Sequence, residues 1–219
     1  MAKQKYSITS INHLDYKHLR QICALVSIPE YNVRKGDFGG YIASYDCLSQ
    51  DDECWVDKEA CVFEGSQVKD SAYISGHAEI RDFCIIQQNA MVLDYAIVAG
   101  YSHLCDFALV KDSAFVYDSF VSNFSRITKN AKILDRAVVK GFSSVTDNAI
   151  IKGDILIHGH SIVNSSCLIK HKHDIVQHKS FTMFYDIYGE LVLNKHFEEE
   201  TLDQTEVESA KNSLNKPTS

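Results

Sequence analysis

An aliphatic side chain recurs at every sixth position over most of this chain. The hexads begin at Trp55 and read WVDKEA, CVFEGS, QVKDSA and YISGHA, with an aliphatic residue second and a small residue sixth in each. The series slips by one residue between Val116 and Val121, then keeps its register through Ile175, giving twenty-one aliphatic positions. An even period suits the alternation of a β-strand and does not fit the 3.6-residue turn of a helix. The pattern therefore predicts a repeat of short strands.

Turn-forming residues stand two places after most of the aliphatic positions, as at Gly76, Asp82, Asp94 and Gly100. Because Asp and Gly tolerate turn conformations, each hexad is predicted to be a short strand followed by a corner, with the aliphatic and small residues pointing inward. Three sides of six residues close a triangular coil of eighteen residues. We therefore predict an all-β fold, a single-stranded parallel β-helix with about six to seven coils. The pattern resembles the hexapeptide repeat of left-handed parallel β-helices, and this resemblance implies the left hand.

The repeat is assigned to residues 55–178, and the segment before it, residues 1–54, is predicted to form a cap helix and a lead-in. A cap is expected because a solenoid leaves unpaired strand edges at its ends. Within residues 13–25, apolar side chains fall on one helical face. The positions on this face are Leu14, His18 or Leu19, Ile22 and Leu25.

The segment after the repeat is predicted to close its other end. Residues 179–204 are assigned to a β-hairpin cap that turns at Tyr188-Gly189. The tail over residues 205–219 is polar and is predicted to be disordered. Together the three parts form one domain with two caps.

Composition narrows the possible partners and the expected location. The chain has 219 residues and a net charge of −7, so we expect no groove for a nucleic acid, which requires a clustered basic surface. Its apolar runs are too short for a membrane span, and its start lacks the apolar core of a secretion signal. The seven cysteines include no CxxC pair, which favours reduced, buried thiols and no metal. A cytoplasmic location is expected, with export by another route as an alternative.

The segment VRKGDFGGYIASYDCLSQDDECWV, from Val33 to Val56, resembles the lead-in of the YdcK-like β-solenoid family of bacterial and prophage proteins. The residues that match this lead-in are Gly36, Asp37, Gly39, Gly40, Ile42, Ser44, Leu48, Ser49, Gln50, Cys54, Trp55 and Val56. The resemblance implies the solenoid fold over most of the chain. Relatives are called transferases by analogy with hexapeptide enzymes, but the family motif carries no catalytic residue. The resemblance therefore implies a fold more than a function.

The outward positions of the repeat carry aromatic and apolar side chains that align from coil to coil. One predicted column holds Phe107, Phe124 and Phe142 and continues into His160 and His178. A second face is predicted to hold Tyr73, Met91, Leu93, Tyr95 and Leu109. Large exposed apolar patches commonly mark interfaces. We therefore expect a non-catalytic structural or interaction scaffold that associates with itself or docks a protein partner.

A hexapeptide-type acyltransferase is the main alternative function. Such an enzyme would use acetyl-CoA or another acyl-CoA and a histidine base, for which the candidates are His103, His160 and His178. The repeats run without a looped insertion that would enclose the cofactor. No catalytic residue is therefore assigned, and no cofactor is expected unless the chain is an acyltransferase.

Acidic residues offer a further alternative. The corner column Glu64, Asp82, Gly100, Asp118, Asp135, Gly153 resembles a calcium ladder or a DNA-mimicking stripe, although corner Asp residues more often bond backbone N–H groups. The run Glu198-Glu199-Glu200 resembles the acidic clusters of some export signals. A secreted bacterial effector or a DNA-mimic-like interaction protein is therefore the second alternative.

Overall fold

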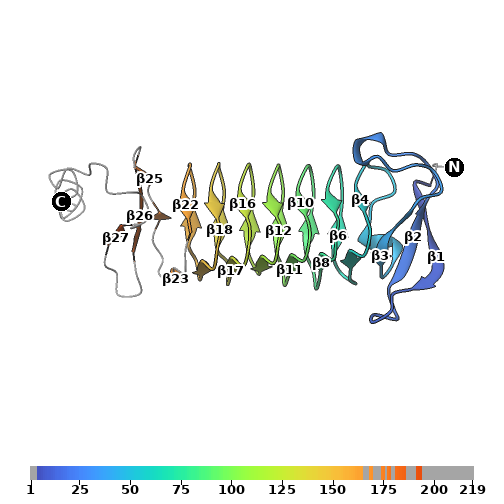
Figure 1. Cartoon of the computed structure of the whole chain (residues 1–219), viewed down its shortest axis with the longest axis horizontal. Helices are drawn as coiled ribbons and strands as arrows, with labels where there is room; N and C mark the ends of the chain where they lie inside the picture. The colour runs from blue at the N-terminus through green and yellow to red at the C-terminus, as the bar shows by residue number, and fades with distance from the viewer. Residues whose placement is uncertain are drawn as a thin grey trace.

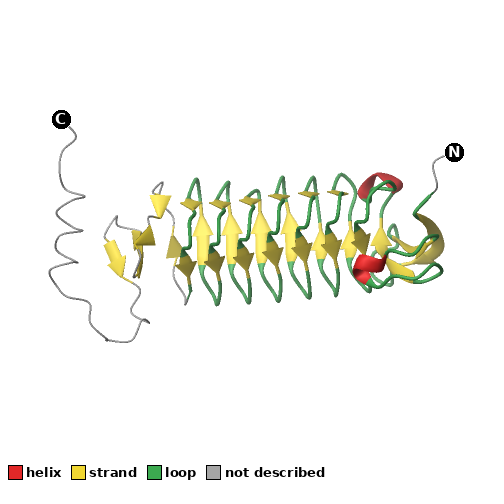
Figure 2. Ribbon diagram, turned by 90° about the horizontal axis from the view of Figure 1, so that it is seen from above, coloured by secondary structure: helices red, strands yellow, loops and turns green. Residues whose placement is uncertain are grey.

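The chain forms a long stack of β-coils, shown by a computed structural model (Figure 1). The structure describes residues 4–164, 168–169, 174–175, 177–178, 181–185 and 191–193, with side chains up to residue 164 and at 168–169. Each coil contributes one short strand to each of three sheets, and the corners between them are loops (Figure 2). The predicted all-β parallel solenoid of about seven coils is confirmed.

The ten-stranded sheet, here the long sheet, contains β1 (Tyr6–Asn12), β2 (Arg20–Ala24), β3 (Phe38–Ile42), β5 (Cys61–Val62), β8 (Glu79–Ile80), β11 (Ile97–Ala99), β14 (Phe115–Tyr117), β17 (Lys132–Leu134), β20 (Ile150–Lys152) and β23 (Leu168–Ile169). The seven-stranded β4 sheet contains β4 (Trp55–Val56), β7 (Tyr73–Ile74), β10 (Met91–Val92), β13 (Leu109–Val110), β16 (Arg126–Ile127), β19 (Ser144–Val145) and β22 (Ile162–Val163). The seven-stranded β6 sheet contains β6 (Gln67–Val68), β9 (Ile85–Ile86), β12 (His103–Leu104), β15 (Phe120–Val121), β18 (Val138–Val139), β21 (Leu156–Ile157) and β24 (Asp174–Ile175).

Two 3-10 turns and three further strands complete the described elements. The turns are η1 (Pro29–Tyr31) and η2 (Tyr45–Cys47). The strands are β25 (Gln177–His178), β26 (Phe181–Tyr185) and β27 (Leu191–Leu193). Strand β26 pairs antiparallel with both β25 and β27. The predicted turn at Tyr188-Gly189 and the predicted disordered tail lie outside the described residues.

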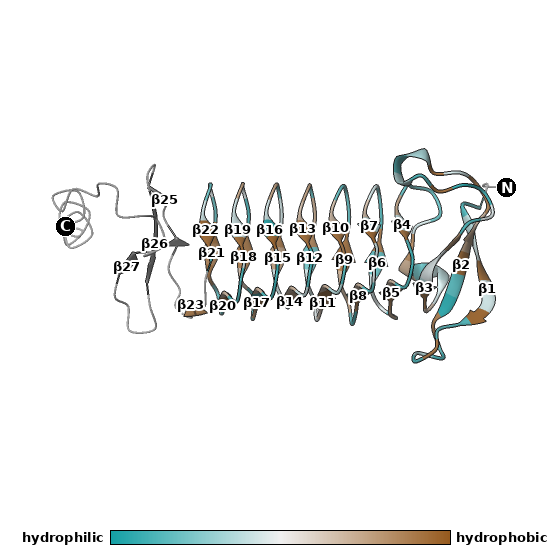
Figure 3. Cartoon of the chain, in the orientation of Figure 1, coloured by the Kyte–Doolittle hydropathy of each residue, from teal (hydrophilic) through white to brown (hydrophobic). Residues whose placement is uncertain are grey.

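The core is a continuous column of the predicted aliphatic residues, closed at the corners by small ones. The aliphatic positions of the hexads are at most 4% exposed from Val56 to Ile169, and Ala60, Ala78 and Ala96 are fully buried beside them. Hydrophobic colour follows the strands, whereas the tips of many corners are hydrophilic (Figure 3). The inward alternation that the period of six predicts is therefore the arrangement that removes these side chains from water.

The one-residue slip falls at a single corner. Paired residues are eighteen apart before it, as in Met91 and Leu109, but seventeen apart across it, as in His103 and Phe120. Val121 returns to the buried position, and pairing eighteen apart resumes with Phe120 and Val138. The shortened side therefore leaves the core in register.

The corners adopt the left-handed backbone conformation that the Asp and Gly positions predicted. Positive φ angles occur at Asp82, Asp94, Asp106 and Gly100, among others, and near Val62 the conformation is taken by Gly65 and not by Glu64. Many corner side chains accept a hydrogen bond from the backbone of the next coil. The Asp70 carboxylate accepts from Gln88 N at 2.9 Å, and that of Asp106 from Asn123 N at 2.9 Å. Corner residues therefore join successive coils.

The predicted helix over residues 13–25 is wrong. Residues 20–24 form β2, which pairs antiparallel with β1 and β3 and extends the long sheet beyond the first coil. Ile22 and Ala24 alternate inward as strand residues do, while Leu14 is 82% exposed and Leu19 is buried in a separate small cluster. Pairing with the open edge of the sheet overrides the helical pattern, because unpaired backbone groups there are costly when buried.

The free edge of β1 is occupied by side chains. The Tyr45 hydroxyl accepts a hydrogen bond from Ile8 N at 3.2 Å, and Gln50 Oε1 accepts from Lys5 N at 2.8 Å. The buried Lys5 ammonium donates to the backbone oxygens of Asp52 and Cys54 at 2.6 and 2.8 Å. Burial lowers the pKa of Lys5, because the charged ammonium loses its contact with water. The two carbonyl partners offset part of this desolvation. The start of this edge is therefore blocked against a further strand.

The paired glycines of the lead-in are required by close packing. A Cβ atom at Gly39 would lie 2.6 Å from Trp55 Cζ2 and 2.6 Å from the Val56 carbonyl oxygen. At Gly40 it would lie 2.5 Å from the Ala60 carbonyl oxygen. Both glycines therefore let β3 approach the first complete coil, with the Trp55 ring fully buried beside them.

We expect Gly39→Ala and Gly40→Ala each to destabilise the fold by about 2 kcal/mol or more, because backbone atoms of the first coil would have to move. Urea unfolding followed by circular dichroism measures the loss. The control Ser10→Ala, at an exposed position of β1, should change stability by less than about 0.5 kcal/mol. Equal stability of all three variants would contradict the close approach.

At the corner, Asp106→Ala should cost about 1–2 kcal/mol, because it removes the acceptor for Asn123 and leaves a β-carbon in the left-handed conformation without a polar side chain. Asp106→Asn retains an acceptor oxygen and a residue that tolerates this conformation, so its cost should be below about 0.5 kcal/mol. Urea midpoints compare the two variants. Equal losses would mean that the inter-coil bond contributes nothing.

Candidate interaction surface

Three phenylalanines and a histidine form one aromatic stack along the corner that joins the β6 sheet to the β4 sheet. We call the column Phe107, Phe124, Phe142 and His160 the Phe107 ladder. Its successive ring centroids are 4.9, 4.8 and 4.9 Å apart, with interplanar angles of 3°, 3° and 8°. This spacing is that of neighbouring strands, so the coil repeat itself brings the rings into contact. The predicted column is confirmed as far as His160, and the side chain of His178 lies outside the described residues.

The Phe107 ladder presents ring edges to solvent. Phe124 and Phe142 have a stacked ring on both faces and Phe107 has one on one face, yet Phe107, Phe124 and Phe142 remain 52%, 47% and 57% exposed. The edge of an aromatic ring carries partial positive charge, whereas its face carries partial negative charge. The exposed part of the ladder therefore favours aliphatic groups and oxygen atoms over a further stacked ring.

Met91 and Leu109 lie beside the Phe107 ladder on adjacent strands of the β4 sheet. Together with the ladder they line a hollow of about 270 Å³. Its lining consists of Asn89, Met91, Phe107, Ala108, Leu109, Phe124 and Arg126. The structure thus brings together four of the predicted surface residues, with Ala108 as a buried floor.

Asn89 and Arg126 were not predicted as members of this surface. Arg126 pairs with Leu109 across β13 and β16, seventeen residues away, so it follows Leu109 in the outward column. The slip in the hexad series was the signal that could have placed it there. Arg126 is exposed and gives this end of the hollow a positive charge.

The other predicted members of the surface lie elsewhere. Tyr73 is covered by Tyr31, whose ring stacks on it at 4.5 Å, and its hydroxyl donates to Asp57 Oδ2 at 2.9 Å. Leu93 is half-buried on the β4 sheet side of the next corner. At that corner, Tyr95 stacks on His77 at 4.9 Å and is 63% exposed. The predicted second face is therefore not continuous: Met91 and Leu109 line the hollow, Tyr73 is covered, and Leu93 and Tyr95 lie toward the next corner.

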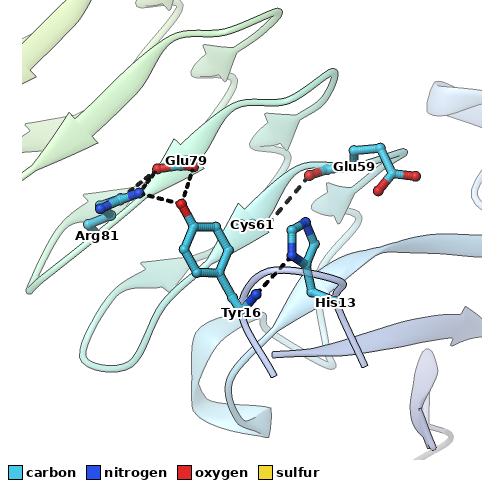
Figure 4. Close-up of polar contacts among 6 residues, drawn as sticks. All are labelled: His13, Tyr16, Glu59, Cys61, Glu79 and Arg81. Carbon is cyan, nitrogen blue, oxygen red and sulfur yellow. Dashed lines mark hydrogen bonds and ion pairs between the residues drawn. The ribbon is translucent and has the colours of Figure 1, made fainter. Parts of the chain in front are cut away.

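The loop between β1 and β2 covers part of the long sheet (Figure 4). The Tyr16 hydroxyl donates to Glu79 Oε1 at 3.1 Å and accepts from Arg81 Nη2 at 2.9 Å, while Arg81 and Glu79 form an ion pair. The Tyr16 ring meets Phe63 edge to face at 5.0 Å. These contacts of Tyr16 hold the N-terminal segment against the first coils. The part of the outer surface that this segment leaves uncovered therefore begins after those coils.

A further outward column runs along the β6 sheet and was also not predicted. It contains the half-buried side chains Ile85, His103, Phe120, Val138 and Leu156. His103 contacts Phe120 edge to face at 5.2 Å, and its Nε2 atom is buried without a hydrogen-bond partner. Burial lowers the pKa of His103. The strict period would have found the column, because each member directly precedes an inward aliphatic residue.

Two of the three candidate histidine bases, His103 and His160, do not come together, and the side chain of His178 lies outside the described residues. His103 lies on the β6 sheet, and His160 lies in the Phe107 ladder three coils further on, about 14 Å along the stack. Burial raises the pKa of Cys61 and Cys84 to about 12, so these thiols are poor nucleophiles at neutral pH. Within the described residues, no three His, Cys, Asp or Glu side chains are grouped to hold a metal ion.

The corner carboxylates act within the stack. Asp82 Oδ2 accepts from Gly100 N at 3.0 Å, and Asp118 Oδ1 accepts from Tyr101 N at 2.8 Å. Asp135 pairs with Lys152 at 3.3 Å. The predicted bonding of corner Asp residues to backbone N–H groups is therefore confirmed for Asp82 and Asp118, with donors in a neighbouring coil.

Two comparisons of the chain with known proteins found no match. No protein-family model matches the chain, and none of the curated proteins matches it. In the described part of the chain, no helix has the length and apolar character needed to cross a membrane. The fold assignment rests on the sheet pairing and the buried hexad positions, and the resemblance of the lead-in remains one of sequence.

We expect His103→Phe to flatten the pH dependence of stability between about pH 7.5 and about pH 5.5. The folded-state pKa of His103 lies below its ordinary value of 6.5, so the unfolded chain binds the extra proton and stability is lost as pH falls through that value. The effect should stay below about 1 kcal/mol, because solvent screens a half-exposed imidazole. Urea unfolding at both pH values measures it. The control Ile85→Phe keeps the histidine and should keep the slope; an unchanged slope in His103→Phe would contradict the assignment.

Proposed function

We propose that this chain is a non-catalytic scaffold of the bacterial YdcK-like solenoid type, which associates with proteins, its own copies included, through the Phe107 ladder and the hollow beside it. The observation that carries this proposal is the half-exposed stack of three phenylalanines on a rigid repeat. Aromatic side chains dominate the energetics of protein interfaces, and an ordered stack loses little conformational entropy on binding.

The shape of the surface supports contact with a macromolecule. The hollow is shallow and crosses three coils in front of Ala108, so a partner would lie along it. His103 and His160, two of the histidines considered as bases, lie far apart, and no described loop leaves the coils to enclose an acyl-CoA. An acyltransferase would instead require a base beside a cofactor site.

We expect the wild-type chain to associate in a concentration-dependent way during sedimentation, and the triple variant Phe107→Ser, Phe124→Ser, Phe142→Ser to associate at least about tenfold more weakly. The matched control is Phe83→Ser with Tyr101→Ser, a stacked exposed pair with centroids 5.4 Å apart at another corner, which should associate like the wild type. Circular dichroism checks that all variants are folded.

Three results would contradict this function. A wild-type mass that stays at the monomer value up to high concentration would remove self-association. Saturable binding of acetyl-CoA in calorimetry would favour the acyltransferase instead. Equal weakening by the control pair would show that association does not depend on the Phe107 ladder.

A further inference from the structure

The hollow beside the Phe107 ladder combines apolar walls with one positive end. Met91 and Leu109 form one wall, and the edges of Phe107 and Phe124 form the other. Arg126 is the one charged residue among the seven that line it. The hollow therefore carries positive charge on a chain whose net charge is −7.

Arg126 is available for an external carboxylate. Two basic side chains on the corners are already paired: Arg136 forms two hydrogen bonds with Asp154, at 2.7 and 3.1 Å, and Lys129 pairs with Asp147 at 2.5 Å. Arg126 has no ion pair or side-chain hydrogen bond with any described residue, and the neighbours in its column are Leu109 and Ser144. The guanidinium fork is suited to a carboxylate, and the positive ring edges nearby add to the attraction.

The sequence of the chain itself contains a segment of complementary chemistry. Residues 197–202, outside the described residues, read FEEETL, with three carboxylates between two apolar side chains. A hollow crossing three coils is about 10 Å long, so it would take about three residues of an extended chain. One apolar side chain and an adjacent carboxylate are therefore enough to fill it.

We propose that the hollow at Met91, Leu109, Phe107, Phe124 and Arg126 binds the acidic segment 197–202 of a second copy of this chain. This inference rests on the proposed function, because it names the segment that the surface would bind. Arg126 binds a glutamate carboxylate, and an apolar neighbour of that glutamate packs between Leu109 and the ring edges. Rising salt weakens the contact, because its charged part is exposed to solvent.

Met91 provides a direct probe of this site. The chain has three methionines, so methyl-labelled methionine gives few NMR signals, and Met91→Leu identifies the one in the hollow. The probes are a synthetic peptide of residues 196–203, HFEEETLD, and its counterpart HFQQQTLD. We expect HFEEETLD to shift the Met91 signal of the full chain. HFQQQTLD should bind at least about fivefold more weakly than HFEEETLD. Arg126→Gln should remove this difference, whereas the control Arg136→Gln, outside the hollow, should preserve it.

A charge exchange tests the contact between full chains. Arg126→Glu alone and the triple variant Glu198→Lys, Glu199→Lys, Glu200→Lys alone should each lose association, and a mixture of the two should regain it. A silent Met91 signal, equal binding of the two peptides, or no rescue in the mixture would overturn the inference. If one of these contradicting results appears while the Phe107 ladder variant still loses association, the proposed function stands. Only the assignment of the acidic segment as the bound partner is then wrong.

Discussion

The fixed vertical alignment of successive coils is the constraint on which the other features depend. It is maintained inside by the aliphatic residue of each hexad, which is buried at every described coil. At the corners it is maintained by left-handed residues whose side chains bond the backbone of the next coil, as Asp70 does with Gln88 and Asp106 with Asn123. Hydrophobic burial is not directional, whereas these hydrogen bonds are, so the corners define the register that burial stabilises.

The same alignment places chemically similar side chains above one another on the outside. For aromatic residues this is favourable, since rings at the strand spacing can stack, as in the Phe107 ladder. For charged residues it would be unfavourable, and several corners carry opposite charges on adjacent coils, such as Lys129 with Asp147 and Arg136 with Asp154. Parts of the outer surface are therefore aromatic or ion-paired columns, and Arg126 stands out because it lies beside an aromatic column.

How much of the fold and of the surface can be predicted from the sequence depends on how far apart in the chain the interacting residues lie. The period of six sufficed for the solenoid, its inward residues and the aromatic ladder, because each coil repeats the same local rule. The cap was mispredicted because β2 pairs with an edge formed by residues far along the chain, which outweighs the helical pattern of residues 13–25. Similarly, nothing near Tyr73 in the sequence indicates that Tyr31 covers it. The hollow was missed because it lies between two columns that the period predicts separately, and Arg126 was not assigned to the column of Leu109.

The shortened corner at Asp118 shows how the fold absorbs a lost residue. In the coil before it, Gly100 is followed by the exposed Tyr101 and then by the buried Ser102, whereas Asp118 is followed directly by the buried Ser119. The missing position is the outermost one, so the Phe83 and Tyr101 stack ends there while Val121 keeps its place in the core. At a corner, the evolutionary loss of one codon can therefore shorten one outer column while every later face keeps its original direction.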